Sequence, residues 1–241
     1  MKPRLIIFAV DGMGHNLLGQ YHLQHLSLNY NGITDISEFS MSRTVVLWSS
    51  FLTGRNMEAD VLGSDNQWAF TVDCEDTFLG TFQDPYVIDL PGYNYDVEGH
   101  GIIKEMMISL LSEEDIPGGL ARYNSTAIDL YLKYRAEFYT ALTGGHDLIL
   151  WYIGATDEIG HLNMGDEETM RRCYAHIEAE VLCRKLAGTS HLMVISDHGM
   201  NVVGRYGDHD DNNGYWATTW ADLGIPRVTQ MRYIIEEKFS C

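Results

Sequence analysis

The chain has 241 residues, of which 45% are hydrophobic and 11% aromatic, and its formal net charge at pH 7 is −18. This composition excludes an intrinsically disordered chain and is sufficient for a large packed core. The negative charge repels nucleic acid and anionic lipid, so we expect neither as a partner. The first apolar run, Leu5–Val10, is too short for a signal-peptide core or a membrane span. We therefore expect a cytoplasmic protein without a membrane anchor.

The cysteines and the absence of linkers define the expected organisation. No internal repeat, low-complexity tract or Pro-rich or Ser-rich linker divides the chain, so we expect residues 1–241 to form one domain. The cysteines form no C-x-x-C pair and are too sparse for a disulfide framework or a thiolate zinc site. We expect reduced thiols at Cys74, Cys173, Cys183 and Cys241.

Continuous apolar runs of strand length predict a parallel sheet that is covered on both faces. They are Leu5–Val10, Leu148–Ile153 and His191–Ser196. Apolar residues at helical spacing predict intervening helices over Tyr123–Ala141 and Met170–Leu182. Weaker patterns predict strands at Trp68–Val72 and Tyr86–Leu90 and a helix around Gly101–Leu111. Alternation of strands and helices predicts an α/β fold, a three-layer α/β/α sandwich with a mostly parallel central sheet.

An aspartate follows each strong strand, at Asp11, Asp157 and Asp197, and two of these lie close to histidines, His161 and His198. Ligands bind beyond the carboxyl ends of strands in open α/β sheets, so we expect these side chains to converge. Mixed Asp/His ligation without cysteine suits zinc, manganese or iron. Asp11 or Asp197 taken alone is more often a helix cap or turn residue than a ligand, and the metal hypothesis rests on the joint pattern.

A candidate nucleophile precedes a short apolar helix that ends at Gly54. Thr44 lies where the N-cap is expected, so its hydroxyl is beside free backbone N–H groups and the positive end of the helix, which binds phosphate. The alternative is that Thr44 only caps the helix.

These segments together resemble the alkaline phosphatase superfamily, in particular its phosphodiesterase/nucleotide pyrophosphatase branch. The matching pieces occur in the family's order and span residues 5 to about 209. They are Asp11-Gly12-Met13-Gly14 after a strand, the helix that ends Thr53-Gly54, Asp157-x-x-Gly160-His161, and Ser196-Asp197-His198-Gly199-Met200.

The resemblance implies two divalent metal ions, zinc first and manganese or iron as alternatives. One ion would be held by Asp11, Thr44, Asp197 and His198, and the other by Asp157, His161 and a late histidine. The best candidate for that histidine is His209. Asp210 follows it where the family often has a glycine, so a solvated acidic turn at residues 208–211 is the alternative reading.

The implied activity is hydrolysis of phosphodiester or nucleotide pyrophosphate bonds in small molecules through a phosphothreonine at Thr44, with the two cations clamping the attacking and leaving oxygens. A threonine nucleophile disfavours a sulfatase, whose nucleophile must be oxidised to an aldehyde. The interval from Gly54 to Asp147 is too short for the large cap domain of related mutases, which favours an open site. A phosphomonoesterase, a phosphomutase, or a metal- and phosphate-binding protein without turnover remain alternatives, and the oligomeric state is undefined.

Residues outside these motifs are assigned smaller roles. Arg43 and Arg55 flank the nucleophile helix and are either substrate-phosphate contacts or surface charges. Three loop aromatics are either part of an aryl or nucleobase pocket or ordinary loop residues: Tyr86, Tyr93 and Tyr95. Histidines interpreted as surface or packed residues are His15, His22, His25, His100, His146, His176 and His191.

Overall fold

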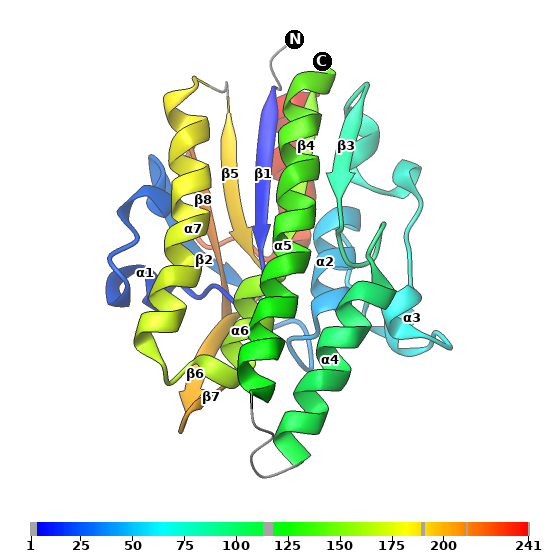
Figure 1. Cartoon of the computed structure of the whole chain (residues 1–241). Coiled ribbons are helices and arrows are strands. Elements are labelled where there is room, and N and C mark those ends of the chain that lie inside the picture. The colour runs from blue at the N-terminus through cyan, green and yellow to red at the C-terminus, as the bar shows by residue number, and fades with distance from the viewer. Residues whose placement is uncertain (1–3, 113–117, 189–190, 211, 241) are drawn as a thin grey trace.

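The computed structural model describes residues 4–112, 118–188, 191–210 and 212–240. A six-stranded sheet with strand order β2-β8-β5-β1-β4-β3 forms its centre, and a separate two-stranded hairpin, β6-β7, projects from one edge (Figure 1). The strands are β1 (Leu5–Val10), β2 (Tyr30–Asp35), β3 (Pro85–Ile88), β4 (Leu148–Ile153), β5 (Leu192–Ser196), β6 (Gly199–Val203), β7 (Tyr206–Asp210) and β8 (Asn213–Thr218).

The central sheet is mostly parallel, as the sequence predicts. β1 pairs in parallel with both β4 and β5, and β3 pairs in parallel with β4. Only β8 runs against its neighbours β5 and β2 within this sheet. The three continuous apolar runs are therefore the three central strands, and every residue of each is buried.

Helices cover both faces of this sheet, so the molecule has three layers. In Figure 1, α5 and α7 lie in front of the strands and α2 lies behind them. The helices are α1 (His15–Gln20), α2 (Thr44–Thr53), α3 (Glu58–Leu62), α4 (Val97–Ser112), α5 (Gly119–Gly144), α6 (Ala155–Asn163), α7 (Glu167–Leu186) and α8 (Met231–Phe239). Short 3₁₀ turns occur at Gln24–Ser27, Gln67–Ala69, Cys74–Asp76, Phe78–Thr81 and Val228–Gln230.

Two hydrophobic cores flank the sheet because successive residues of a strand point to opposite faces. In β1, Phe8 packs into the core beneath α5 and α7, whereas Ile7 packs into the core beneath α2 and α8. Such a strand excludes water on both sides, which explains why its sequence shows no polar alternation.

The weaker sequence predictions have mixed outcomes. The helix expected around Gly101–Leu111 is α4, and the strand expected at Tyr86–Leu90 is β3. The strand expected at Trp68–Val72 is wrong. Gln67–Ala69 forms a 3₁₀ turn instead, because the side chain of Asn66 accepts a hydrogen bond from the backbone N–H of Trp68 and closes the chain locally.

No helix in the described part of the chain is long and apolar enough to cross a bilayer. Three cysteines, Cys74, Cys173 and Cys183, are free thiols, and Cys241 lies outside the described residues.

Candidate functional site

The carboxyl ends of the three central strands bring the predicted aspartates to one edge of the sheet. β1 is the middle strand, and the backbone N–H of Asp11 donates to the carbonyl of Ile153 at the end of β4 (3.0 Å). Gly12 makes this approach possible: its φ is +69°, and a Cβ atom there would lie 3.2 Å from the Cα of Asp157. The close approach of the β1 and β4 exits therefore suits a glycine at residue 12, which adopts a positive φ without strain and adds no side chain against Asp157.

Asp11, Asp197 and His198 form the first cluster, and their potential ligand atoms all lie within 4.8 Å of one another. The Nε2 atom of His198 lies 3.1 Å from Oδ1 of Asp11 and 3.6 Å from Oδ2 of Asp197. All three residues are at most 1% exposed. Burial and the neighbouring charge of Asp11 hold the pKa of Asp197 well above its usual range, so two ionised carboxylates here require a compensating positive charge.

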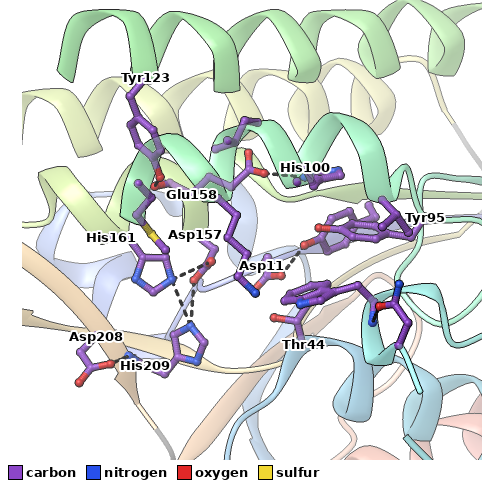
Figure 2. A pocket seen from close by; sticks show the side chains of 18 residues that line it. Asp11, Thr44, Tyr95, His100, Tyr123, Asp157, Glu158, His161, Asp208 and His209 are labelled. Atoms are coloured by element: carbon purple, nitrogen blue, oxygen red, sulfur yellow. Dashed lines mark hydrogen bonds and ion pairs between the residues drawn. The ribbon is translucent and has the colours of Figure 1, made fainter. Parts of the chain in front are cut away.

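Asp157, His161 and His209 form the second cluster, again within 4.8 Å. Asp157 and His161 are four residues apart on α6 and share a face of that helix, with 3.2 Å between Oδ2 and Nε2. Burial alone would raise the pKa of Asp157, but the charges of His161 and His209 hold it well below its usual range. Figure 2 shows the three side chains converging on one wall of the pocket.

His209 lies on strand β7, so the alternative reading of its surroundings as a solvated acidic turn is wrong for residues 208–210. β7 pairs with β6 directly after Asp197 and His198, and this hairpin carries His209 back to the sheet edge. The Nδ1 atom of His209 lies 2.9 Å from the carbonyl oxygen of Ser42 in the loop before α2. The hairpin is thereby tied to the loop that carries Thr44.

One hydrogen-bonding pattern recurs in all three histidines. The Nδ1 atom of His198 faces the carbonyl of Gly199 (2.8 Å), that of His161 faces Gly207 (3.3 Å), and that of His209 faces Ser42. A carbonyl only accepts, so each Nδ1 carries a proton, and Nε2 is the nitrogen of each ring that is left to face a carboxylate or a cation. Such a backbone contact fixes the tautomer of metal-ligating histidines in proteins.

Buried polar atoms without a hydrogen-bond partner indicate whether a cation would fit these clusters. Within the two clusters, five buried side-chain atoms have no hydrogen-bond partner: Asp11 Oδ1, Asp157 Oδ1, Asp197 Oδ1, Asp197 Oδ2 and His198 Nε2. In addition, Nε2 of His161 and Nε2 of His209 face each other at 3.3 Å. Two imidazole nitrogens at this distance either share a proton or face a common cation. The donor sets, one histidine with two carboxylates and two histidines with one, fit Zn²⁺ or Mn²⁺.

Thr44 lines the same pocket as Asp11 and the second cluster. The cavity has a volume of about 390 Å³, and its lining includes Asp11, Thr44, Asp157, His161 and His209. The expected N-cap assignment is off by one residue: Arg43 holds the cap position and Thr44 is the first residue of α2. Thr44 therefore stays in the first turn, beside the free N–H groups and positive end of the helix. The predicted stop at Gly54 is observed, with φ +69°.

Neither flanking arginine lines this pocket. Arg55 lies beyond the opposite end of α2 from Thr44, about 15 Å away along the helix axis at 1.5 Å per residue. Arg43 extends its guanidinium to the side chain of Gln67 (3.1 Å). The structure thus brings the seven predicted nucleophile and ligand residues together and leaves both arginines outside.

Tyr152 is a site residue that the sequence does not indicate. Its hydroxyl donates to Oδ2 of Asp11 (2.5 Å), and its side chain is buried on the strand that ends before Asp157. Burial and the charge of Asp11 raise its pKa well above the usual range, so it remains a neutral donor. Tyr152 orients Asp11 and leaves Oδ1 of that carboxylate free to face His198.

His100 forms a second unpredicted feature at the wall of the pocket. Its packed position agrees with the sequence interpretation, but its ring is held between two carboxylates, with Nε2 2.7 Å from Asp89 and Nδ1 2.5 Å from Glu158. Burial alone would lower the pKa of His100, but the two carboxylates raise it to about 10. His100 also stacks on Tyr95, which lines the pocket, whereas Tyr86 and Tyr93 do not.

Replacing His100 with alanine is expected to destabilise the fold by about 3–5 kcal/mol near neutral pH, because it leaves two buried carboxylates unpaired. The folded-state pKa lies above the ordinary value of 6.5. The stabilisation is therefore complete below about pH 6.5 and is lost as the pH rises towards 10. Urea unfolding at pH 6.5 and pH 10 measures this difference. His146→Ala is the control, because its partner Asp84 is 64% exposed and the loss should be about 1 kcal/mol or less. Equal losses in the two variants would contradict the assignment.

Comparison with known proteins supports the fold. No protein-family model and no curated protein matches the chain. Among solved structures, alkaline phosphatase from the Antarctic bacterium TAB5 is similar, with a TM-score of 0.55, 12% identity, and coverage of 98% of this chain and 97% of that one. The sulfatase PsFucS1 from a Pseudoalteromonas species is also similar, with a TM-score of 0.54, 9% identity, and coverage of 98% and 67%. These matches confirm the alkaline phosphatase-like fold that the motifs predict.

Proposed function

We propose that this chain of alkaline phosphatase-like fold is a metal-dependent phosphoric-ester hydrolase of the phosphodiesterase/nucleotide pyrophosphatase type, with Thr44 as nucleophile. The observation that carries the proposal is the pair of three-residue clusters, Asp11/Asp197/His198 and Asp157/His161/His209. Asp11 of the first cluster and all three residues of the second line the cavity that Thr44 also lines. Two divalent cations, preferably Zn²⁺, with Mn²⁺ or iron as alternatives, suit these donors. The enzyme forms one catalytic domain and acts in the cytoplasm, where its free thiols remain reduced.

The chain's own residues support a two-step displacement. Thr44 gives up its hydroxyl proton to solvent, and its Oγ1 bonds to phosphorus as the ester P–O bond on the opposite side breaks. The departing oxygen takes a proton from solvent and leaves as the alcohol. Water then attacks the phosphothreonine, its oxygen bonds to phosphorus as the Oγ1–P bond breaks, and a proton returns to Oγ1 as the phosphate product leaves. Cations held by the two clusters would supply Lewis acidity that favours ionisation of the threonine hydroxyl and departure of the leaving oxygen. Tyr152 holds Asp11, and the carbonyls of Ser42, Gly207 and Gly199 hold the three histidines, so that the ligand atoms keep their directions.

The absence of an arginine from the described pocket lining favours a diester over a monoester. The lining contains four carboxylates, Asp11, Asp157, Glu158 and Asp208, and one lysine, Lys104, and neither Arg43 nor Arg55 is part of it. A phosphodiester carries one negative charge at neutral pH, whereas a monoester carries nearly two, and the pocket offers no guanidinium to pair with the additional charge of the monoester. The threonine at position 44 supports phosphate over sulfate as the group transferred, since it yields no aldehyde.

A substrate comparison tests this function. The protein loaded with Zn²⁺ or Mn²⁺ is expected to hydrolyse bis(4-nitrophenyl) phosphate with a higher kcat/KM than 4-nitrophenyl phosphate. The reverse order would identify a phosphomonoesterase or phosphomutase instead. Tight metal binding without hydrolysis of either ester, with any divalent ion, would identify a metal- and phosphate-binding protein and overturn the enzymatic proposal.

A further inference from the structure

The cavity continues beyond the two clusters along α4, and this outer part differs in chemistry. Trp68, Tyr95, Met107 and Lys104 line it. The Nζ atom of Lys104 lies 4.6 Å from the centroid of the Trp68 ring. Trp68 is in turn stacked with Tyr95, with 5.7 Å between ring centroids. The outer cavity is therefore an apolar, aromatic surface with an ammonium group fixed over it.

The geometry of α4 locates Lys104 relative to the two clusters. His100 and Lys104 are four residues apart in this helix, so they share a face and lie about 6 Å apart along its axis. The ring of His100 contacts Glu158, the residue next to Asp157. Lys104 is thus about one helical turn farther along α4 than His100, which contacts Glu158 beside the second cluster. An organic group of about the size of one benzene ring spans this interval.

The charge of Lys104 is available to a ligand. Among the described residues that line the cavity it is the one lysine or arginine, and no ion pair joins it to a carboxylate of the described chain. The four carboxylates that line the cavity have other partners: Tyr152 binds Asp11, His161 and His209 face Asp157, His100 binds Glu158, and Asp208 accepts from the backbone N–H of His209. A negative group in the outer cavity would therefore meet an ammonium that the protein itself does not neutralise.

We propose that Lys104 and Trp68 form a specificity subsite for a second negative group on the organic part of the substrate. This inference rests on the proposed function, because the scissile phosphate must sit at the two clusters. The favoured ligand class is an ester of an aromatic group that carries its own carboxylate or phosphate. Its ring packs on Trp68, and its distal negative group pairs with Lys104.

Calorimetric titration of the zinc-loaded protein with two non-hydrolysable ligands tests the subsite. Phenylphosphonate offers the ring and the phosphorus group, and 4-carboxyphenylphosphonate adds a negative charge at the far end of the ring. The wild type is expected to bind the carboxylated ligand about tenfold more tightly, the scale of one charge-assisted contact. Lys104→Ala should lose this preference and keep its affinity for phenylphosphonate, which also shows that the variant is folded.

Lys185→Ala is the matched control, because Lys185 is an exposed lysine in the last turn of α7 and does not line the cavity. It should retain the tenfold preference. Equal affinities of the two ligands in the wild type, or a preference that survives in Lys104→Ala, would overturn the subsite and leave the proposed function intact. Binding of neither phosphonate would instead overturn the phosphate site, and with it the proposed function.

Discussion

Replacing Thr44 with alanine is expected to reduce hydrolysis of bis(4-nitrophenyl) phosphate by a factor of about 10⁴ or more, the scale seen when a nucleophile is removed from a hydrolase. The reason is that the displacement then has no oxygen at the start of α2 to bond to phosphorus. Metal content should stay near that of the wild type, because each cluster keeps its three Asp and His residues. Steady-state rates together with metal analysis of the purified variant measure both quantities.

Thr44→Ser is the matched control for this experiment. Serine keeps the hydroxyl at the first position of the helix and is expected to retain a large part of the activity. Trapping and mass analysis of the wild type during turnover should place a phosphoryl group on the peptide that contains Thr44. Wild-type rates in Thr44→Ala would remove Thr44 as the nucleophile, even if both cations were bound.

Replacing His209 with alanine is expected to reduce the bound metal from two ions to one and to lower kcat by at least about 10²-fold, the scale of losing one preorganised electrostatic contact. Only Asp157 and His161 then remain in the second cluster, and two side chains hold a divalent ion weakly. Metal analysis after dialysis against a low concentration of free Zn²⁺, with steady-state rates on the same sample, checks this result.

Asp208→Ala is the control for His209, because Asp208 is the preceding residue, also lines the cavity and is not part of either cluster. It should retain two ions and most of the activity. If His209→Ala also retained two ions and the wild-type rate, the late ligand would lie elsewhere and the assignment of the second cluster would be wrong.

The parts of the fold that the sequence predicts are those with a strong local pattern. β1, β4 and β5 are recognisable because both of their faces are buried, so every position is apolar. The strands β2 and β8 have no such pattern. β2 contains Gly32, where a Cβ atom would lie 2.9 Å from the ring of Trp216, its partner residue on β8 184 positions later in the sequence. Strands shaped by partners so distant in the sequence cannot be recognised from their local pattern.

At the site too, residues that follow a strong local pattern are predictable and residues that act through distant contacts are not. Asp11, Asp157 and Asp197 follow recognisable strands, and the rule that carboxyl ends of parallel strands meet at one edge is enough to predict their convergence. Tyr152 and His100 act through contacts that span 141 and 58 residues of sequence, respectively. No spacing or motif marks them, because a tyrosine in a strand and a histidine in a helix are ordinary packing residues.

Anomalous diffraction at the zinc absorption edge, from crystals of the zinc-loaded protein, is the most direct measurement of the paired-cation centre. We expect two peaks beside Thr44, one between Asp11, Asp197 and His198 and the other between Asp157, His161 and His209. Peaks confined to other parts of the surface, or none at the carboxyl ends of β1, β4 and β5, would contradict the account of this site.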